Sequence, residues 1–394
     1  MKKKVLSALL CASMVATMVA GCGGSSSETT DSNAAADNSA ADNSAAAGTE
    51  EAAAPAASGD TIALRVWAAE EDQTLTNELI EQFKEANPDQ TFDITVGVES
   101  EANAKDDILV DPTAAADVFA FASDQLIDLV DAGVLQAVQD VDTVSSQNVA
   151  GAVEAATVDG TLYAYPMSAD NGYFLYYDSN VVTDPTNWDA ILTDCAAAGK
   201  KAGMVLASGW YNAGFFYGAG FTTVLNDDGS TAMDWNGTSA DGIKGTDVVD
   251  GMLAIATNPA FLPITDGDTA NQIATGELGA IVSGTWDAIT AKEVFGDGYA
   301  ATKLPTFTVG DKQVQQGSVA GYKYVGVNGY SENSGWAVLL AEYLTNEESQ
   351  QMFFDQRESG PSNKNVAASD SVQENVALAA LAAGIVIVRK RVHR

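Results

Sequence analysis

Apolar and polar residues alternate from Ile62 onward, and this pattern predicts a strand. Every second residue from Ile62 to Val66 is apolar, and the run ends at Trp67. Apolar residues then recur at helical spacing over 76–86. Further segments follow in the order strand, strand, helix, at 92–96, 117–121 and 124–131. This succession of strands and helices predicts an α/β domain with a largely parallel sheet.

The second half of the chain continues the mixed pattern. A hairpin is predicted at 159–166 and a strand at 173–177, and residues 275–284 indicate a helix end that runs into a strand. Helices are predicted at 188–198, 247–256, 336–344 and 346–357. The chain has 394 residues, which is enough for two domains with full cores.

The N-terminus has the pattern of a secretory signal, residues 1–21, in which three lysines precede an apolar run. That run is shorter than the apolar segment that a membrane-spanning helix usually needs. Small residues directly precede Cys22, and this pattern resembles the bacterial lipoprotein signal. We therefore expect a lipid anchor on the Cys22 thiol and a location at the cell membrane, on its extracytoplasmic face. An ordinary signal peptide followed by an incidental cysteine is the alternative.

Residues 22–60 are predicted to form a disordered acidic tether. They are rich in Ser, Ala, Asp, Asn, Gly and Glu, and cannot repay the entropy of ordering. A flexible coil of this length spans roughly 35 Å. That length is enough to lift a domain above a membrane.

Charge and composition exclude several functions. The net charge is −35, and 54 acidic residues face only 19 basic ones, so the chain repels nucleic acid and anionic lipid. Cys11 would leave with the signal and Cys22 would be lipidated, so Cys195 has no partner, and we expect it to be a buried, inert thiol. The single histidine is His393. A Ser-His-Asp or Cys-His mechanism is therefore not expected, and neither are a cofactor or a metal site.

Three predicted strand ends carry an aromatic residue beside carboxylates. Ligands of open α/β sheets bind at such ends. An aromatic ring stacks on the apolar face of a sugar, and a carboxylate accepts hydrogen bonds from its hydroxyls. Trp210 and Tyr211 add an aromatic pair in a glycine-flanked loop. The three strand-end groups are Trp67 with Glu70 and Glu71, Phe121 with Asp124, and Trp286 with Asp287.

Other interpretations of these residues remain open. Each aromatic residue could simply be packed, and paired carboxylates could serve a glycosidase, although no spacing singles out an acid and a nucleophile. Asp266-Gly267-Asp268 could hold calcium but lacks the later ligands of a calcium loop, so a plain turn is favoured.

The order of these pieces resembles the extracellular solute-binding proteins of ABC sugar importers, close to the maltose/maltodextrin-binding group. The resemblance runs from about residue 61 to about residue 365. It rests on the opening strand, residues 116–121 with Asp124, 160–170, 176–178, 304–307 and 342–348. It also includes Gly284-Thr285-Trp286, which is similar to the family's Gly-Pro-Trp turn with Thr in place of Pro.

The resemblance implies two α/β lobes joined by hinge crossovers, with a ligand cleft between them. Lobe one would be 61–166 with 306–358, and lobe two 167–305 with 359–383. The chain would cross at Tyr165-Pro166 and at Leu304-Pro305. The positions that match sugar contacts of the family are Trp67, Glu70, Glu71, Asp124, Asp170, Trp210, Tyr211 and Trp286, and Phe121 stands where a tryptophan is usual.

The resemblance also implies the function and the partners. A monomeric binding protein would capture an oligosaccharide, of the maltose or maltodextrin type, and deliver it to the permease of an ABC importer without catalysis. A different solute, such as a polyamine or a peptide, is the alternative, and a surface glycosidase is a weaker one. The basic tail at 384–394 departs from the family. A frame-shifted or truncated end is one explanation for it, and a genuine basic tail is the other.

Overall fold

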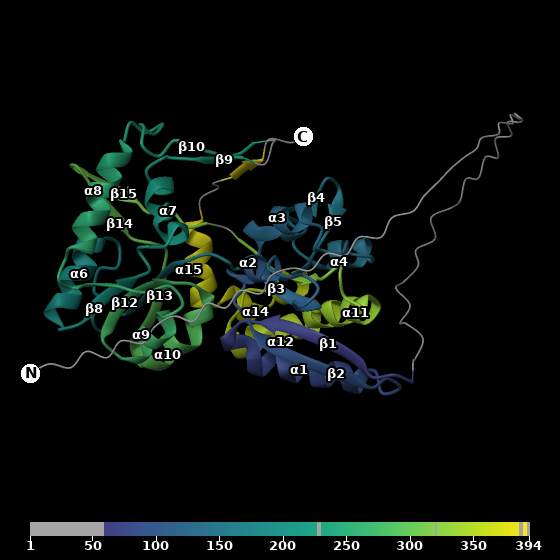
Figure 1. Cartoon of the computed structure of the whole chain (residues 1–394). Coiled ribbons are helices and arrows are strands. Elements are labelled where there is room, and N and C mark those ends of the chain that lie inside the picture. The colour runs from purple at the N-terminus through teal and green to yellow at the C-terminus, as the bar shows by residue number, and fades with distance from the viewer. Residues whose placement is uncertain (1–58, 227–229, 320, 386–388, 392–394) are drawn as a thin grey trace, which may run out of the picture. The chain divides into compact units, whose positions relative to one another are not determined.

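The computed structural model describes residues 59–226, 230–319, 321–385 and 389–391. The signal segment, Cys22, the tether up to residue 58, and His393 lie outside the described residues. Two five-stranded sheets, each covered by helices, form two lobes (Figure 1). This arrangement confirms the predicted two-lobe α/β fold. Among the described helices, none is long and apolar enough to cross a membrane.

The first sheet contains the strands predicted near the N-terminus. Its order is β2-β1-β3-β16-β6; β1 is parallel to β2 and β3, whereas β16 is antiparallel to β3 and β6. The sheet is therefore parallel only over its first three strands. The bounds are β1 (Ile62–Ala68), β2 (Phe92–Val98), β3 (Val118–Ala122), β6 (Tyr165–Ser168) and β16 (Lys323–Val327).

Helices from both ends of the chain cover this sheet. Leu79, Ile80 and Phe83 recur at helical spacing and are all buried, so α1 turns its apolar face to the core. Phe83 contacts the edge of the Trp336 ring at a centroid distance of 6.5 Å, which joins α1 to α11. The helices of this lobe are α1 (Gln73–Ala86), α2 (Ala104–Ile108), α3 (Leu126–Asp131), α4 (Val141–Gln147), α5 (Ala150–Ala155), α11 (Ser334–Thr345) and α12 (Glu347–Arg357).

The predicted hairpin begins slightly earlier than expected. β4 (Thr157–Val158) pairs with β5 (Thr161–Leu162) in antiparallel register. Asp159 and Gly160 connect them with φ values of 49° and 81°. Two consecutive positive φ angles are typical of the tight turns that match strand twist, and Asp-Gly suits them.

The second sheet has the order β11-β8-β12-β7-β13. β8 is parallel to β11 and β12, whereas β7 is antiparallel to both β12 and β13. All six residues of β12 are buried. This burial explains the uninterrupted apolar run that predicted a strand there. The bounds are β7 (Phe174–Asp178), β8 (Lys201–Met204), β11 (Phe261–Pro263), β12 (Leu278–Ser283) and β13 (Tyr299–Thr302).

The second core is rich in large aromatic side chains. Trp188 is buried at the start of α6, where its indole N–H donates to Gln316 Oε1 at 3.1 Å. Cys195 is fully buried on the same helix, as predicted, and burial raises the pKa of its thiol to about 11, which favours the inert form. The helices of this lobe are α6 (Trp188–Ala197), α7 (Gly209–Gly218), α8 (Gly245–Ala256), α9 (Thr269–Ala274), α10 (Ala288–Phe295) and α15 (Val376–Gly384).

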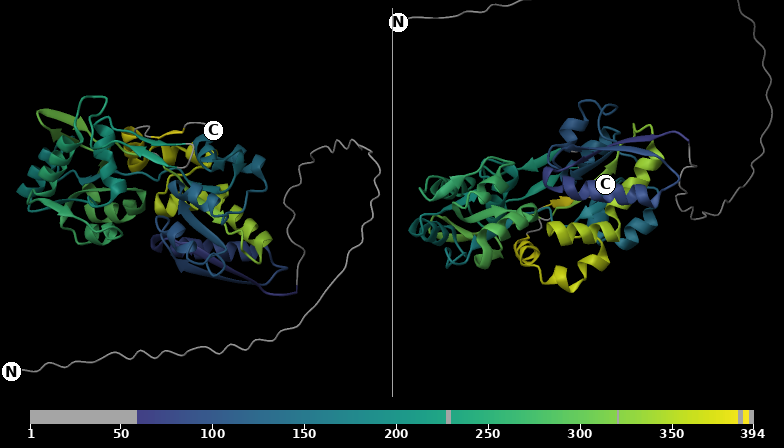
Figure 2. Two further views of the ribbon diagram at one scale, coloured as in Figure 1. Left: turned by 45° about the horizontal axis from the view of Figure 1, so that its top comes forward. Right: turned by 90° about the horizontal axis from the view of Figure 1, so that it is seen from below.

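The lobes exchange chain segments at places that differ in part from the prediction. The chain passes between them after β6, between β15 and β16, and between α12 and α15 (Figure 2). The hairpin of β14 (Thr306–Val309) and β15 (Lys312–Gln315) belongs to lobe two, because Phe307 packs on Phe215 at 4.9 Å. The predicted crossing at Leu304-Pro305 and the lobe boundary at 306 are therefore wrong.

The last segments connect α12 to the second sheet. Two short helices, α13 (Lys364–Ala367) and α14 (Asp370–Gln373), lead to α15. Beyond α15, the backbone of β17 (Arg389–Arg391) runs parallel to β9 (Thr223–Leu225), which also pairs with β10 (Thr231–Met233). The basic end of the chain thus adds a strand to a hairpin of lobe two.

Candidate functional site

Four aromatic side chains gather in lobe two, at the carboxyl end of β12. Trp286 lies on η3 (Thr285–Asp287), directly after that strand, and its ring is 5.9 Å from that of Trp210 at the start of α7. Tyr173 packs edge-on against Trp210 at 4.6 Å, and Tyr211 packs on both. The two tryptophans are half-buried and the two tyrosines are buried. We call these four residues the aromatic cluster.

Local interactions fix the orientation of the rings. A Cβ at Gly284 would lie 2.1 Å from the Trp286 ring, so only glycine lets the indole fold back at this point. The Tyr173 hydroxyl donates to the Trp210 carbonyl at 2.9 Å. Burial raises the pKa of Tyr211 well above its usual range, so its hydroxyl stays protonated and can donate a hydrogen bond.

Two cations of lobe one reach Trp286. Arg357 lies at the end of α12 and donates from Nη2 to the Trp286 carbonyl at 3.3 Å, while its Nε is 3.1 Å from Asp72 Oδ1. Lys323 lies at the start of β16, with Nζ 5.8 Å from the Trp286 ring centroid and 3.0 Å from Glu101 Oε1. The two lobes therefore meet at Trp286.

Burial and charge shift the pKa values of this network. Burial raises the pKa of Asp72 to about 6, although Lys323 and Arg357 partly oppose the shift. Burial would lower the pKa of Lys323, but Glu101 and Asp72 outweigh it and hold the ammonium charged. Burial also raises the pKa of Asp287, which accepts from Ser283 Oγ at 2.6 Å. At neutral pH the network therefore keeps both cations, each beside a carboxylate.

The structure brings together three of the aromatic residues that the sequence predicted, Trp286, Trp210 and Tyr211. Glu70 and Glu71 are exposed on η1 (Glu70–Asp72), after β1, and Asp124 is exposed on η2 (Ser123–Gln125), after β3. Glu71 is close enough to act electrostatically on Asp72, Lys323 and Asp287. These residues stay candidate ligand contacts.

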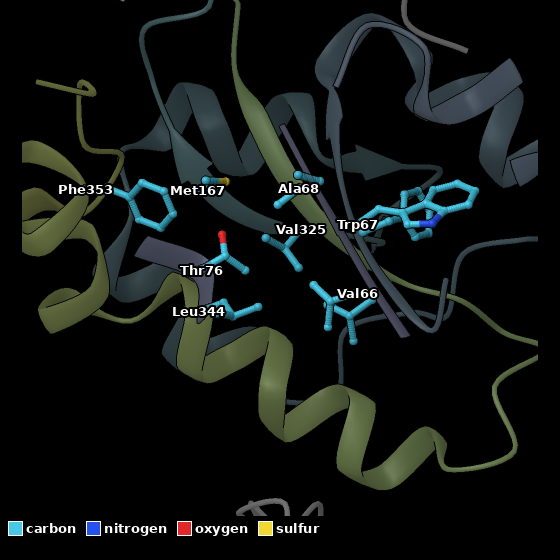
Figure 3. A pocket seen from close by; sticks show the side chains of 11 residues that line it. Val66, Trp67, Ala68, Thr76, Met167, Val325, Leu344 and Phe353 are labelled. Carbon is cyan, nitrogen blue, oxygen red and sulfur yellow. The ribbon is translucent and has the colours of Figure 1, made fainter. Parts of the chain in front are cut away.

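Trp67 packs on Gly97 and not on the rings of the aromatic cluster. Its indole is half-buried over Gly97 of the neighbouring strand β2, where an added Cβ would approach to 3.1 Å. Val66 and Ala68 alternate with Trp67 along β1 and are buried, and all three residues line a small apolar cavity of about 20 Å³. Figure 3 shows the Trp67 indole directed away from Phe353 on the far wall of that cavity. Trp67 therefore presents its ring on the face of the sheet that α1 does not cover.

Phe121 is not placed as expected. It is completely buried and packs between Phe119 and Tyr324, at centroid distances of 5.5 and 5.7 Å. Phe119 and Phe121 are two residues apart on β3, so both point into the same face of the core. Phe121 is therefore a core residue rather than a ligand contact.

Asp170 is likewise occupied within the protein. Its Oδ1 accepts from Ser168 Oγ at 2.5 Å, and its Oδ2 accepts from Thr285 Oγ1 and the Gly360 amide, both at 2.6 Å. Ser359 Oγ adds a longer bond at 3.3 Å. These donors take up the hydrogen-bonding capacity of a buried carboxylate. The expectation that Asp170 contacts a ligand is therefore corrected. Asp170 links two segments that connect the lobes, at Ser168 and Gly360, to the Trp286 loop at Thr285.

Sequence reasoning missed Tyr173, Glu101, Lys323 and Arg357, and it noted Asp72 only as part of the acidic run that follows Trp67. Lys323 is the first residue of β16 and Arg357 is the last residue of α12. Their carboxylate partners are 222 and 285 residues away along the chain. Local patterns cannot reveal such pairs. The one available signal was the small number of basic residues. The chain has only 19 of them against 54 acidic residues, so each basic residue is a candidate partner for a carboxylate.

A second cavity, of about 400 Å³, lies where α10 meets the end of α12. Lys292 Nζ pairs with Glu358 Oε1 at 2.7 Å across this junction. None of the predicted ligand contacts lines it. The lining residues are Lys292, Tyr299, Phe354, Asp355, Glu358, Ser371, Glu374, Asn375 and Val376.

The possible calcium loop, residues 266–268, forms a turn whose Asp268 side chain is hydrogen-bonded to neighbouring side chains. Gly267 has a φ of 80°, as in a turn, and both carboxylate oxygens of Asp268 accept side-chain hydrogen bonds, from Asn271 and Gln272. The part of the chain that the structure describes holds no group of three or more side chains placed to bind a metal ion. The plain-turn interpretation is therefore favoured by direct contacts.

Two α/β lobes that meet at an aromatic cluster backed by paired charges define a binding protein of the two-lobe type. The sequence profile of the family described as "Bacterial extracellular solute-binding protein" matches residues 78–380, and the chain belongs to this family. A solute-binding protein is not an enzyme, and the family is extracellular. No curated protein matches the chain.

Solved structures show the same relationship. A protein solved with acarbose is 28% identical, with a TM-score of 0.71 over 84% of this chain and 88% of its own. The maltodextrin-binding protein MalE1 from L. casei BL23 is 25% identical, with a TM-score of 0.63 over 82% and 85%. The maltose/maltodextrin-binding domain MalE from Bdellovibrio bacteriovorus, bound to maltotriose, is 18% identical with a TM-score of 0.69 over 83% and 89%, and supports the fold.

Proposed function

We propose that this protein captures a maltodextrin-like oligosaccharide outside the cell and passes it to the permease of an ABC importer. The aromatic cluster carries this proposal, because Trp210 and Trp286 offer half-buried rings where the two lobes meet. Such rings stack on the apolar faces of sugar units. The likeness to a maltodextrin-binding protein and to a protein solved with acarbose supports sugar as the ligand class.

Polar groups around the cluster would bind the sugar hydroxyls. Glu71 is exposed beside the network that reaches Trp286, and Glu70, Asp124 and Trp67 are further candidates. Charged acceptors make short, strong hydrogen bonds to hydroxyl groups. Contacts from both lobes would favour a closed conformer, and the permease would recognise that state.

Isothermal titration calorimetry tests the ligand class. Maltotriose and acarbose are titrated into the purified protein, and spermidine and a dipeptide serve as the rival ligands. We expect saturable binding of at least one of the two sugars. Binding of spermidine without binding of either sugar would favour the polyamine alternative, which the exposed acids Glu70, Glu71 and Asp124 would suit.

We also propose that Cys22 carries a lipid anchor and that the mature protein works as a monomer. The lysines and apolar run that precede Cys22 support the anchor. Metabolic labelling with an alkyne fatty acid in the native host should label the wild type and spare Cys22→Ser. Cys195→Ser is the matched control and should be labelled like the wild type, because Cys195 is buried.

A further inference from the structure

We propose that Arg357 is a positioning residue for Trp286: it holds the Trp286 loop of lobe two against lobe one, and Asp72 holds Arg357 in place. The inference rests on the proposed function, because it concerns the ring that would stack on the sugar. The new element is that Arg357, a residue of lobe one, helps to orient the Trp286 ring of lobe two.

The geometry of Arg357 carries the proposal. One guanidinium bonds both the Asp72 carboxylate, at 3.1 Å, and the Trp286 carbonyl, at 3.3 Å. The Arg357 and Asp72 side chains are only 19% and 10% exposed, so solvent screens their attraction weakly. A planar, multiply bonded guanidinium fixes its partners better than a lysine ammonium would. The Trp286 loop is therefore held in part by a residue outside its own lobe.

Lys323 supports the same loop from the ring side. Its ammonium is held by Glu101 at 3.0 Å and lies 5.8 Å from the Trp286 ring centroid. Lys323 and Arg357 thus act on the ring and on the carbonyl of one residue. Loss of either contact would free one end of Trp286 while the other stays in place.

Asp72 makes this arrangement sensitive to pH. The charged groups facing it are Lys323, Glu101, Glu71 and Arg357, and its pKa is raised to about 6 by burial. Above pH 6 the carboxylate is ionised and pairs with Arg357. As the pH falls below 6, Asp72 takes up a proton and loses that ion pair, so the Trp286 carbonyl loses an oriented donor.

Fluorine NMR of protein labelled with 5-fluorotryptophan tests the proposal without any ligand. The Trp286 signal is identified by its absence in Trp286→Phe. In the wild type it should move between pH 7.5 and 5 with a midpoint near 6, and in Arg357→Gln it should be displaced at pH 7.5 and should not titrate. Arg65→Gln is the matched control, because Arg65 also pairs with a carboxylate, Asp117, but it is exposed and donates to the carbonyls of Thr113 and Ala114.

Asp72→Asn should abolish the titration, whereas Asp287→Asn should retain it. That pair of variants separates Asp72 from Asp287, whose pKa burial also raises. A Trp286 signal in Arg357→Gln identical to the wild type at pH 7.5 would overturn the proposal. So would a transition that persists in Asp72→Asn.

Sugar titrations of the same variants separate this inference from the proposed function. If the wild type binds a sugar, Arg357→Gln should weaken binding about tenfold at pH 7.5, as expected for loss of a charge-assisted hydrogen bond. Wild-type affinity should fall below pH 6, and the affinity of Asp72→Asn should be flat across that range. If the wild type binds no sugar, the proposed function fails, and the fluorine signals alone decide whether Arg357 positions Trp286. An unchanged affinity in an Arg357→Gln protein that melts like the wild type would also contradict the inference.

Discussion

The ends of β3 and β12 resemble each other in sequence but differ in the structure. Each has an aromatic residue followed by an aspartate: Phe121 before Asp124, and Trp286 before Asp287. Phe121 lies within its strand and is fully buried, whereas Trp286 comes after its strand has ended and joins the aromatic cluster. The position of the ring relative to the last strand residue, rather than its proximity to a carboxylate, separates a core residue from a candidate ligand contact.

Trp67 lies between these two cases. It is the next-to-last residue of β1, and its ring is half-buried because Gly97 on the neighbouring strand leaves room above it. A side chain within a strand can therefore stay available where the adjacent position is a glycine. Phe121 also has a glycine on the neighbouring strand, Gly326 of β16, where an added Cβ would approach its ring to 3.1 Å. Phe119 and Tyr324 nevertheless pack on Phe121 directly and bury it, so a neighbouring glycine is not sufficient to keep a ring available.

The largest effect is expected from Phe121→Ala. Removing a fully buried phenylalanine leaves a cavity and should lower the free energy of unfolding by about 3–5 kcal/mol. Urea denaturation measures this, with Phe121→Leu as a control that should cost about 1 kcal/mol. Sugar affinity of the protein that remains folded should be unchanged. A large loss of sugar affinity with little loss in the free energy of unfolding would show that Phe121 contacts the ligand after all.

Trp286→Ala should produce the opposite result. Loss of the stacking ring should weaken sugar binding by about 2 kcal/mol, or roughly 30-fold. Calorimetric titration measures the change. Trp235→Ala is the matched control: Trp235 is also half-buried in lobe two, but it stacks on Phe216 at 4.6 Å, away from the cluster. Equal losses of affinity in both variants would mean that the effect is structural.

The sequence predicted most of the fold because the relevant signals are local. The alternation from Ile62 to Val66 and the apolar run of β12 specify strands through the burial of their own side chains. The boundary at residue 306 failed because Phe307 finds its packing partner, Phe215, far along the chain. A proline before a strand shows that the chain is constrained there, but it does not show which lobe the strand joins.

The sequence predicted most aromatic residues of the candidate site but not the cations, Lys323 and Arg357, that contact Trp286. Trp210, Tyr211 and Trp286 stand out by residue type, and the chain has only six tryptophans. Asp170 stood out in the same way, yet its carboxylate is satisfied by Ser168, Thr285 and Gly360 from three separate segments. Whether a carboxylate is free or satisfied depends on tertiary contacts, so a single sequence does not determine it.

Thr285→Val should have an intermediate effect and sharpen the contrast between β3 and β12. The substitution keeps the shape but removes the hydroxyl that donates to Asp170 at 2.6 Å, and should lower the free energy of unfolding by about 1.5 kcal/mol. Thermal denaturation measures it. Thr306→Val is the control, because its hydroxyl bonds are solvent-exposed and should contribute little. Equal effects of the two variants would show that the Asp170 bond does not fix the Trp286 loop.

The smallest effect is expected from Glu71→Gln, compared with Glu70→Gln. Both side chains are exposed on η1, but only Glu71 contributes to the pKa shifts of Asp72, Lys323 and Asp287. Neutralising Glu71 should weaken sugar binding by about 0.5–1 kcal/mol, roughly two- to fivefold, whereas neutralising Glu70 should change it less than twofold. Calorimetry at low and moderate salt measures both variants. If Glu70→Gln has the larger effect, the sugar binds further from Trp286 than the aromatic cluster implies, and the contrast between the ends of β3 and β12 no longer identifies the site.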